Sequence, residues 1–134
     1  MIEAEILSKY HNVAMVGVSP KEDRDSNKVA IYLSQHGYNI IPVNPNTTEV
    51  ISKKSYADLS SIPDKVEIVD IFRKSEEVGP IVDEAIRVGA EVIWMQEGIK
   101  NDQAAAKARE AGLLVVMDKC MKKTHENLTK LPNL

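Results

Sequence analysis

The chain has 134 residues, and its mix of 43% hydrophobic and 28% charged residues is typical of one soluble globular domain spanning 1–134. Its net charge of −3 lacks the basic footprint of a nucleic-acid-binding protein, and its single cysteine excludes an internal disulfide or a multi-cysteine zinc site. No apolar run approaches the roughly 18 residues of a membrane span, and the N-terminus does not resemble a signal peptide, so we expect a cytoplasmic protein without a membrane partner.

Short apolar runs alternate with helical patterns from the start of the chain. A helix at 3–10 precedes a buried strand at 13–16. The spacing of apolar residues then predicts a helix over 28–36. Ser26 or Asn27 is its expected N-cap, because a short polar side chain there can accept a free backbone N–H.

The second strand, 39–43, contains a proline. Pro42 cannot donate a ladder hydrogen bond, so this position belongs near a strand end or on a sheet edge. The weakly periodic stretch 44–65 predicts a long connection with a short helical turn near 57–59, and 66–72 is the third strand.

The second half of the chain continues the alternation. The elements expected are a helix that starts near 75–80 and ends at 88, a strand at 92–95, a helix at 101–111 capped by Asn101, a strand at 113–117 and a helix at 121–128. Strands that alternate with helices indicate βαβ crossovers. The predicted fold class is therefore α/β: a doubly wound parallel five-stranded sheet, strand order 3-2-1-4-5, in three layers α/β/α.

Ligands of such sheets bind beyond the carboxyl ends of the strands, where the strand order reverses. With the predicted order, this reversal falls between the first and fourth strands. The loops that would face the site are 17–27, 44–46, 72–75, 96–101 and 118–120.

The first of these loops is suited to hold phosphate. It joins a strand to a helix start, where backbone amides and the helix dipole favour an anion. Gly17 is its only glycine, however, so it is not a G-x-G-x-x-G fingerprint and could equally be an ordinary turn. The second strand also ends without the acidic residue that binds the ribose of NAD, which disfavours a nicotinamide dinucleotide.

Six short motifs, in this order and spacing, carry a resemblance to a known family. They are Val16-Gly17-Val18-Ser19-Pro20, Gly37-Tyr38, Pro42-Val43-Asn44-Pro45, Asp70-Ile71-Phe72-Arg73, Trp94-Met95-Gln96-Glu97-Gly98-Ile99 and Asp118-Lys119-Cys120. From about residue 3 to residue 126, the chain resembles the small stand-alone CoA-binding domain proteins. These are similar to the N-terminal CoA-binding domain of the succinyl-CoA ligase alpha subunit.

The resemblance implies a Rossmann-like domain that binds coenzyme A through its ADP portion. The residues it implies at the pyrophosphate are Gly17, Val18, Ser19, Pro20, Arg24, Ser26 and Asn27. Those implied along the adenosine are Val43, Asn44 and Pro45, with Lys53 or Lys54 at a ribose phosphate, and those implied along the pantetheine arm are Ile71, Phe72, Arg73 and Gln96. Ser52-Lys53-Lys54 stands where relatives often have a glycine.

Two of these side chains have a second interpretation. Arg73 could donate bidentately to a phosphate or pair with Glu76 or Glu77. Phe72 could stack on adenine or belong to the core.

A catalytic centre is not expected from this sequence. The ligase's phosphorylated histidine belongs to a second domain, and His11, His36 and His125 have no partner at triad or metal-ligand spacing. Cys120 precedes a predicted helix, where a thiol could form a mixed disulfide with CoA, but lone cysteines are commonly buried. Asp118 and Glu97 lie on facing loops, with no sign that they meet.

Three functions remain open. The first is a non-enzymatic carrier, sensor or regulatory module that binds CoA or an acyl-CoA, with a possible homo-oligomer. The second is a CoA- or nucleotide-dependent enzyme component that needs a ligase-like partner subunit. The third, which the loop and the second strand disfavour, is an NAD(P)-binding protein.

Overall fold

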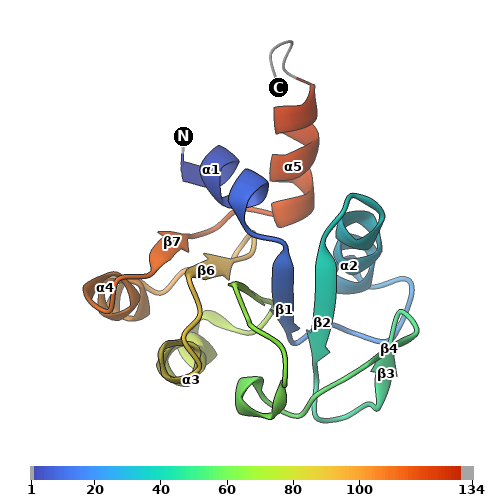
Figure 1. Ribbon diagram of the computed structural model, residues 1–134, viewed down its shortest axis with the longest axis horizontal. Coiled ribbons are helices and arrows are strands. Elements are labelled where there is room, and N and C mark those ends of the chain that lie inside the picture. The colour runs from blue at the N-terminus through green and yellow to red at the C-terminus, as the bar shows by residue number, and fades with distance from the viewer. Residues whose placement is uncertain (1, 131–134) are drawn as a thin grey trace.

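Five parallel strands form the central sheet of the computed structural model, which describes residues 2–130 (Figure 1). The strands are β1 (Asn12–Val16), β2 (Asn39–Val43), β5 (Ile68–Ile71), β6 (Val92–Met95) and β7 (Leu114–Val116). All four pairings between neighbours are parallel. The structure thus confirms a doubly wound, Rossmann-like α/β fold with strands close to their expected positions.

The order of the strands is not the expected 3-2-1-4-5. It is β2-β1-β5-β6-β7, which is 2-1-3-4-5 when the five strands are numbered along the chain. The third strand, β5, pairs with β1, and β2 lies on the sheet edge. Pro42 gives the physical reason: its carbonyl accepts from Tyr56 N–H on the outer side of β2, so its ring nitrogen also faces outward, where a further strand would need a donor.

Helices cover both faces of the sheet. The helices α1 (Ile2–Lys9), α2 (Asp25–Gln35) and α5 (Met121–Thr129) lie on one face, and α3 (Val78–Arg87) and α4 (Asp102–Glu110) lie on the other (Figure 1). Alternate strand residues supply the two cores, so Met15 and Trp94 contact the first set of helices and Ala14 and Ile93 the second. Within residues 2–130, no helix has the length and hydropathy needed to cross a membrane.

The connection after β2 has more regular structure than its sequence predicts. A two-residue turn at Ile51 and Ser52 joins β3 (Glu49–Val50) to β4 (Lys53–Lys54), and a short 3₁₀ helix, η1, follows at Leu59–Ser61. Both turn residues have positive φ, 48° and 62°, a conformation that glycine adopts more readily than isoleucine or serine. Val50 on this hairpin is buried in the core.

Of the two predicted helix N-caps, one is confirmed and the other is wrong. Asn101 caps α4, because its side chain accepts from Ala104 N–H at 2.9 Å. Neither Ser26 nor Asn27 caps α2: the helix already starts at Asp25, and Arg24 occupies the cap position without a side-chain cap bond. The side chains of Ser26 and Asn27 instead form hydrogen bonds with the preceding loop.

Candidate ligand-binding site

The corrected strand order moves the reversal point to the gap between β1 and β5. The chain leaves β1 through α2 on one face of the sheet and leaves β5 through α3 on the other. A crevice at the carboxyl ends of these two strands is where doubly wound sheets bind their ligands. All five predicted loops still lie at this edge, because every strand of the sheet is parallel.

Gly17 allows the chain that leaves β1 to pass close to the end of β5. Its φ is +88°, and a Cβ built there would lie 2.5 Å from the carbonyl oxygen of Phe72. Its amide donates to Val43 O at 2.9 Å. Only glycine combines this conformation with so close an approach to the end of β5, where the Phe72 carbonyl and the Arg73 side chain occupy the space that a Cβ would take.

The loop after Gly17 is held by the first turn of α2. The Ser26 hydroxyl accepts from Ser19 N–H at 2.9 Å, and the Asn27 side-chain amide donates to Ser19 O at 2.9 Å. Val18 is fully buried, whereas Pro20 and Arg24 are exposed. The two polar residues that were expected at the pyrophosphate therefore fix the shape of the loop.

A hollow of about 380 Å³, here called the β2–α3 hollow, opens on the α3 side of Gly17. Its lining includes the predicted Gly17, Val43, Asn44, Pro45 and Arg73, together with Val16, Ala57, Asp58, Glu77, Ile81 and Glu84. The Asn44 side chain donates to Val18 O at 2.9 Å and so ties the end of β2 to the first loop.

Arg73 pairs with an acid on the rim of this hollow. Its Nε donates to Glu77 at 2.9 Å, and this hydrogen bond holds the pKa of the Glu77 carboxyl below its usual value. Both side chains are half exposed. Of the two interpretations of Arg73, the structure shows the ion pair, and the Arg73 Cδ lies beside Gly17.

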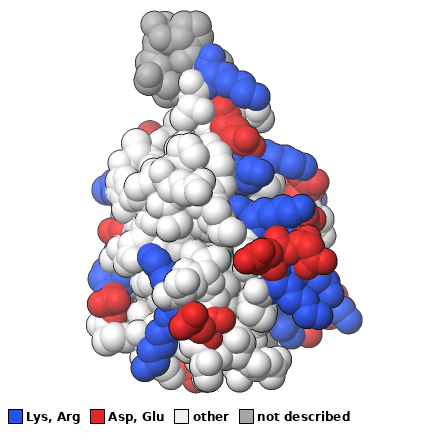
Figure 2. Space-filling model, turned by 90° about the vertical axis from the view of Figure 1, so that its right-hand side faces the viewer, with Lys and Arg blue, Asp and Glu red and all other residues white. Residues whose placement is uncertain are grey.

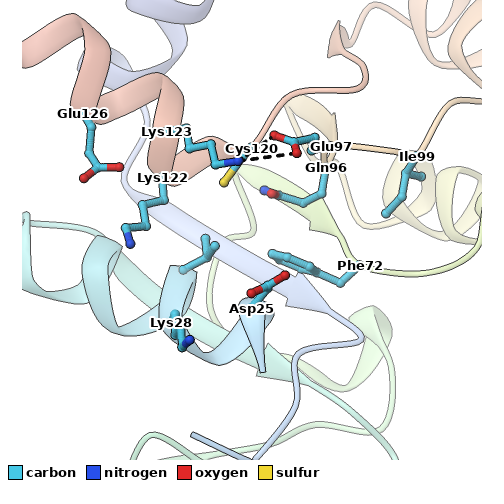
Figure 3. Close-up of a pocket in the computed structure, with 11 residues that line it drawn as sticks. Asp25, Lys28, Phe72, Gln96, Glu97, Ile99, Cys120, Lys122, Lys123 and Glu126 are labelled. Carbon is cyan, nitrogen blue, oxygen red and sulfur yellow. Dashed lines mark hydrogen bonds and ion pairs between the residues drawn. The ribbon is translucent and has the colours of Figure 1, made fainter. Parts of the chain in front are cut away.

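A second space, the α2–α5 cavity, lies on the opposite face of the sheet at the same edge and has a volume of about 330 Å³ (Figure 3). It is lined by Asp25, Lys28 and Val29 of α2, by Phe72, Gln96, Glu97 and Ile99, and by Cys120, Lys122, Lys123 and Glu126 at α5. Lys123 and Glu97 form an ion pair at 3.1 Å, which raises the pKa of Lys123.

Below the cavity lies a buried carboxyl group, that of Asp70, which was not among the predicted site residues. Asp70 on β5 is 0% exposed, and its Oδ1 accepts from the Gln96 side-chain amide at 2.6 Å. Burial raises the pKa of Asp70 to about 7, and the Gln96 hydrogen bond only partly opposes this. An acid inside an otherwise apolar strand, Ile68–Ile71, is the signal that could have found it.

The remaining predicted site residues differ in where the structure places them. Phe72 and Gln96 line the α2–α5 cavity, so Phe72 faces the side of the sheet opposite the β2–α3 hollow. Ile71 is fully buried. Lys53 is not brought to this edge, since its Nζ donates to Asn39 at the start of β2; Lys54 lies over the Tyr56 ring, next to the end of β2.

The remaining polar candidates have structural partners. Asp118 accepts from Gly98 N–H at 2.6 Å, and Tyr32 and His125 share a hydrogen bond of 2.7 Å. Burial lowers the pKa of His125, and nearby His36 adds to this effect. Among residues 2–130, no three His, Cys, Asp or Glu side chains are grouped to hold a metal ion.

The surface beside α2 and the β3–β4 hairpin carries charges of both signs. In Figure 2 the basic and acidic side chains are interspersed along both margins, and uncharged side chains cover much of the centre of this face. This face has no broad area of one sign.

Comparison with known proteins gives consistent matches over nearly the whole chain. The sequence profile of the CoA binding domain family matches residues 11–126. The uncharacterized protein YneT of Bacillus subtilis is 37% identical over 121 residues, which are 90% of each chain. A hypothetical protein from Pyrococcus horikoshii OT3 has a similar structure, with a TM-score of 0.92, 45% identity and coverage of 96% of this chain and 90% of that one.

A larger enzyme contains the same fold as one part of its chain. The dinucleotide forming acetyl-coenzyme A synthetase 1 of Ca. Korarchaeum cryptofilum, in complex with phosphate and ADP, matches with a TM-score of 0.71. The match covers 87% of this chain and 27% of the synthetase, at 23% identity. At this identity the likeness concerns the fold alone.

Proposed function

The chain belongs to the CoA binding domain family, and from this membership we propose that it binds coenzyme A at the carboxyl edge of the sheet. The strand-to-helix turn that begins at Gly17 is the observation that carries the proposal, because the backbone amides before a helix favour an anion. A Cβ at this position would meet Phe72 O and Arg73 Cδ, so glycine keeps this turn packed against the end of β5.

We place the ADP part at the β2–α3 hollow. The hollow combines the carboxyl ends of β1 and β2, the Gly17 backbone and the Arg73 guanidinium. An ADP group carries several negative charges, and three acids, Asp58, Glu77 and Glu84, line the hollow together with Arg73. Asp58 and Glu84 already accept hydrogen bonds from the η1 segment, and Arg73 can exchange its exposed partner Glu77 for a phosphate, since exposed ion pairs are weak.

We place the pantetheine arm in the α2–α5 cavity. Phe72 and Ile99 offer apolar contacts for its methylene groups, and Gln96 can hydrogen-bond its polar end. The two spaces lie on opposite faces of the sheet, and neighbouring residues line them: Phe72 lines the cavity and Arg73 lines the hollow. A long ligand with an anionic end and a thiol end matches this arrangement.

We further propose that the protein binds CoA without transforming it, as a carrier, sensor or regulatory module. Lys123 and Glu97, which line the α2–α5 cavity together with Cys120, form an ion pair with each other. If this is correct, protein incubated with acetyl-CoA will release no more free thiol than a protein-free control does. Release above that background would favour an enzyme.

Calorimetric titration at two salt concentrations tests the binding proposal. We expect CoA to bind more tightly than dephospho-CoA and NADH, and its affinity to fall as salt screens the phosphate contacts. Equal affinity for NADH would contradict the assignment, and absence of binding by all three would leave only the fold.

A further inference from the structure

Asp70 is an unusual residue to find under the α2–α5 cavity. In the register of the sheet it lies between Met15 and Trp94, two residues of the apolar core. One carboxyl oxygen accepts from Gln96, and the other has no hydrogen-bond partner among the described residues. Burying an acid with one hydrogen bond is costly, so such groups often serve a function.

Gln96 connects this acid to the cavity. It lies two residues after Trp94, on the same face, and is only 4% exposed. Its amide points into the cavity toward Cys120 (Figure 3). Because Nε2 donates to Asp70, Oε1 is the atom left for the cavity, and no hydrogen bond to it forms within residues 2–130.

The state of Asp70 decides which end of the amide faces the cavity. An ionised carboxylate can only accept hydrogen bonds, so it holds the NH₂ group of Gln96 against itself. The cavity then presents the Gln96 oxygen, an acceptor without a protein partner among residues 2–130.

We propose that Asp70 and Gln96 make the α2–α5 cavity select a free thiol over a thioester at the end of its ligand. This inference rests on the proposed binding of CoA. The S–H group of free CoA donates a weak hydrogen bond to Gln96 Oε1. A thioester has no donor at this position, so it leaves Oε1 unpaired and sets a second acceptor against it.

The selectivity depends on pH. Burial raises the pKa of Asp70 to about 7, so the carboxyl group is ionised at alkaline pH and neutral at acidic pH. When neutral, its O–H can donate to Gln96 Oε1, and the amide can turn its NH₂ toward a thioester carbonyl. The preference for the thiol therefore falls as the pH falls through about 7.

Other titratable groups face the cavity from each surrounding element. They are Asp25 and Lys28 on α2, Glu97 after β6, and Cys120, Lys122, Lys123 and Glu126 at α5. CoA and acetyl-CoA carry the same phosphates and differ only at the sulfur. Effects of these groups on the phosphates cancel in the ratio of the two affinities.

The test is calorimetric titration of CoA, under reducing conditions, and of acetyl-CoA. At about pH 8 we expect the full-length protein to prefer CoA by about fivefold, as the net value of one hydrogen bond implies. At about pH 5.5 the preference should approach unity, because a group with a pKa near 7 is then mostly protonated.

Two variants separate selectivity from folding. Gln96→Met keeps the length of the side chain and removes the acceptor, so it should abolish the preference at both pH values. Asp70→Asn, which like the neutral acid can donate to Gln96 Oε1, should hold the ratio near unity at both pH values. Matched changes at exposed positions, Gln103→Met and Asp64→Asn, should change neither. All four should bind the ADP part alone, 3′-phospho-ADP, as the unaltered protein does.

The results distinguish a failure of the proposed thiol selectivity from a failure of the proposed CoA binding. If CoA and acetyl-CoA bind equally well to the unaltered protein, or if Gln96→Met retains the preference, this inference is wrong and the proposed function stands. If neither compound binds, the proposed function is wrong and the inference falls with it.

Discussion

At the scale of single residues, the site depends most on Gly17. In Gly17→Ala, the new Cβ would lie 2.5 Å from Phe72 O, a backbone atom that cannot move without displacing the end of β5. The residue would also keep a φ of +88°, which alanine adopts poorly. We expect the free energy of unfolding to fall by about 2–4 kcal/mol, measured by urea denaturation, and CoA binding to weaken with it.

Gly79→Ala is the matched control for this change. Gly79 lies in α3, has no neighbour within 4 Å of the added Cβ and does not have a positive φ. Its replacement should leave stability unchanged or raise it by up to about 1 kcal/mol, because alanine favours a helix over glycine. A Gly17→Ala protein that unfolds and binds as the Gly79→Ala protein does would contradict the role of Gly17.

The sequence predicted the positions of some site residues better than those of others. Gly17 follows directly after a strand, so its place at the carboxyl edge follows from the pattern alone. The same reasoning correctly brought Asn44 and Arg73 next to it. The sequence marks Asp70 only as an acid inside an apolar strand, because its burial between two neighbouring strands and its contact with Gln96 depend on the tertiary structure. Lys53 was misjudged because the path of the β3–β4 hairpin depends on tertiary contacts.

At the scale of elements, α4 offers a simple test of the helix starts. Asn101 accepts from Ala104 N–H and also donates to Ser75 O at 2.9 Å, so it links α4 to the segment that precedes α3. Asn101→Ala should lower the free energy of unfolding by about 1–2 kcal/mol. Urea denaturation will measure this, with the exposed Lys100→Ala as the neutral control. Equal stability of both variants would show that the cap contributes little.

The strands themselves were predictable, but their neighbours were not. A buried parallel strand appears in the sequence as a short apolar run, which says nothing about which strand lies beside it. Pro42 contained the missing information, because a proline with its nitrogen facing outward belongs on the sheet edge. The error moved the reversal point but not the site, since all the strands are parallel and end at the same edge.

At the scale of the whole molecule, the two faces of the sheet contribute one space each. The β2–α3 hollow lies on the face covered by α3, and the α2–α5 cavity lies on the other. A ligand that reaches both must cross the carboxyl edge at Gly17. Short ligands that fill only the hollow should therefore leave the cavity, and Cys120 within it, open to solvent.

Alkylation of Cys120 tests this arrangement, because it is the only cysteine of the chain and lines the cavity while remaining partly exposed. A CoA analogue that lacks the sulfur, and so does not consume the reagent, should slow alkylation by iodoacetamide severalfold. At saturation, 3′-phospho-ADP should slow it little, because the ADP part alone does not enter the cavity. Mass spectrometry of the intact protein over time gives both rates. Equal protection by the two compounds would mean that the ADP part lies in the α2–α5 cavity, and no protection by either would place the thiol end elsewhere on the molecule.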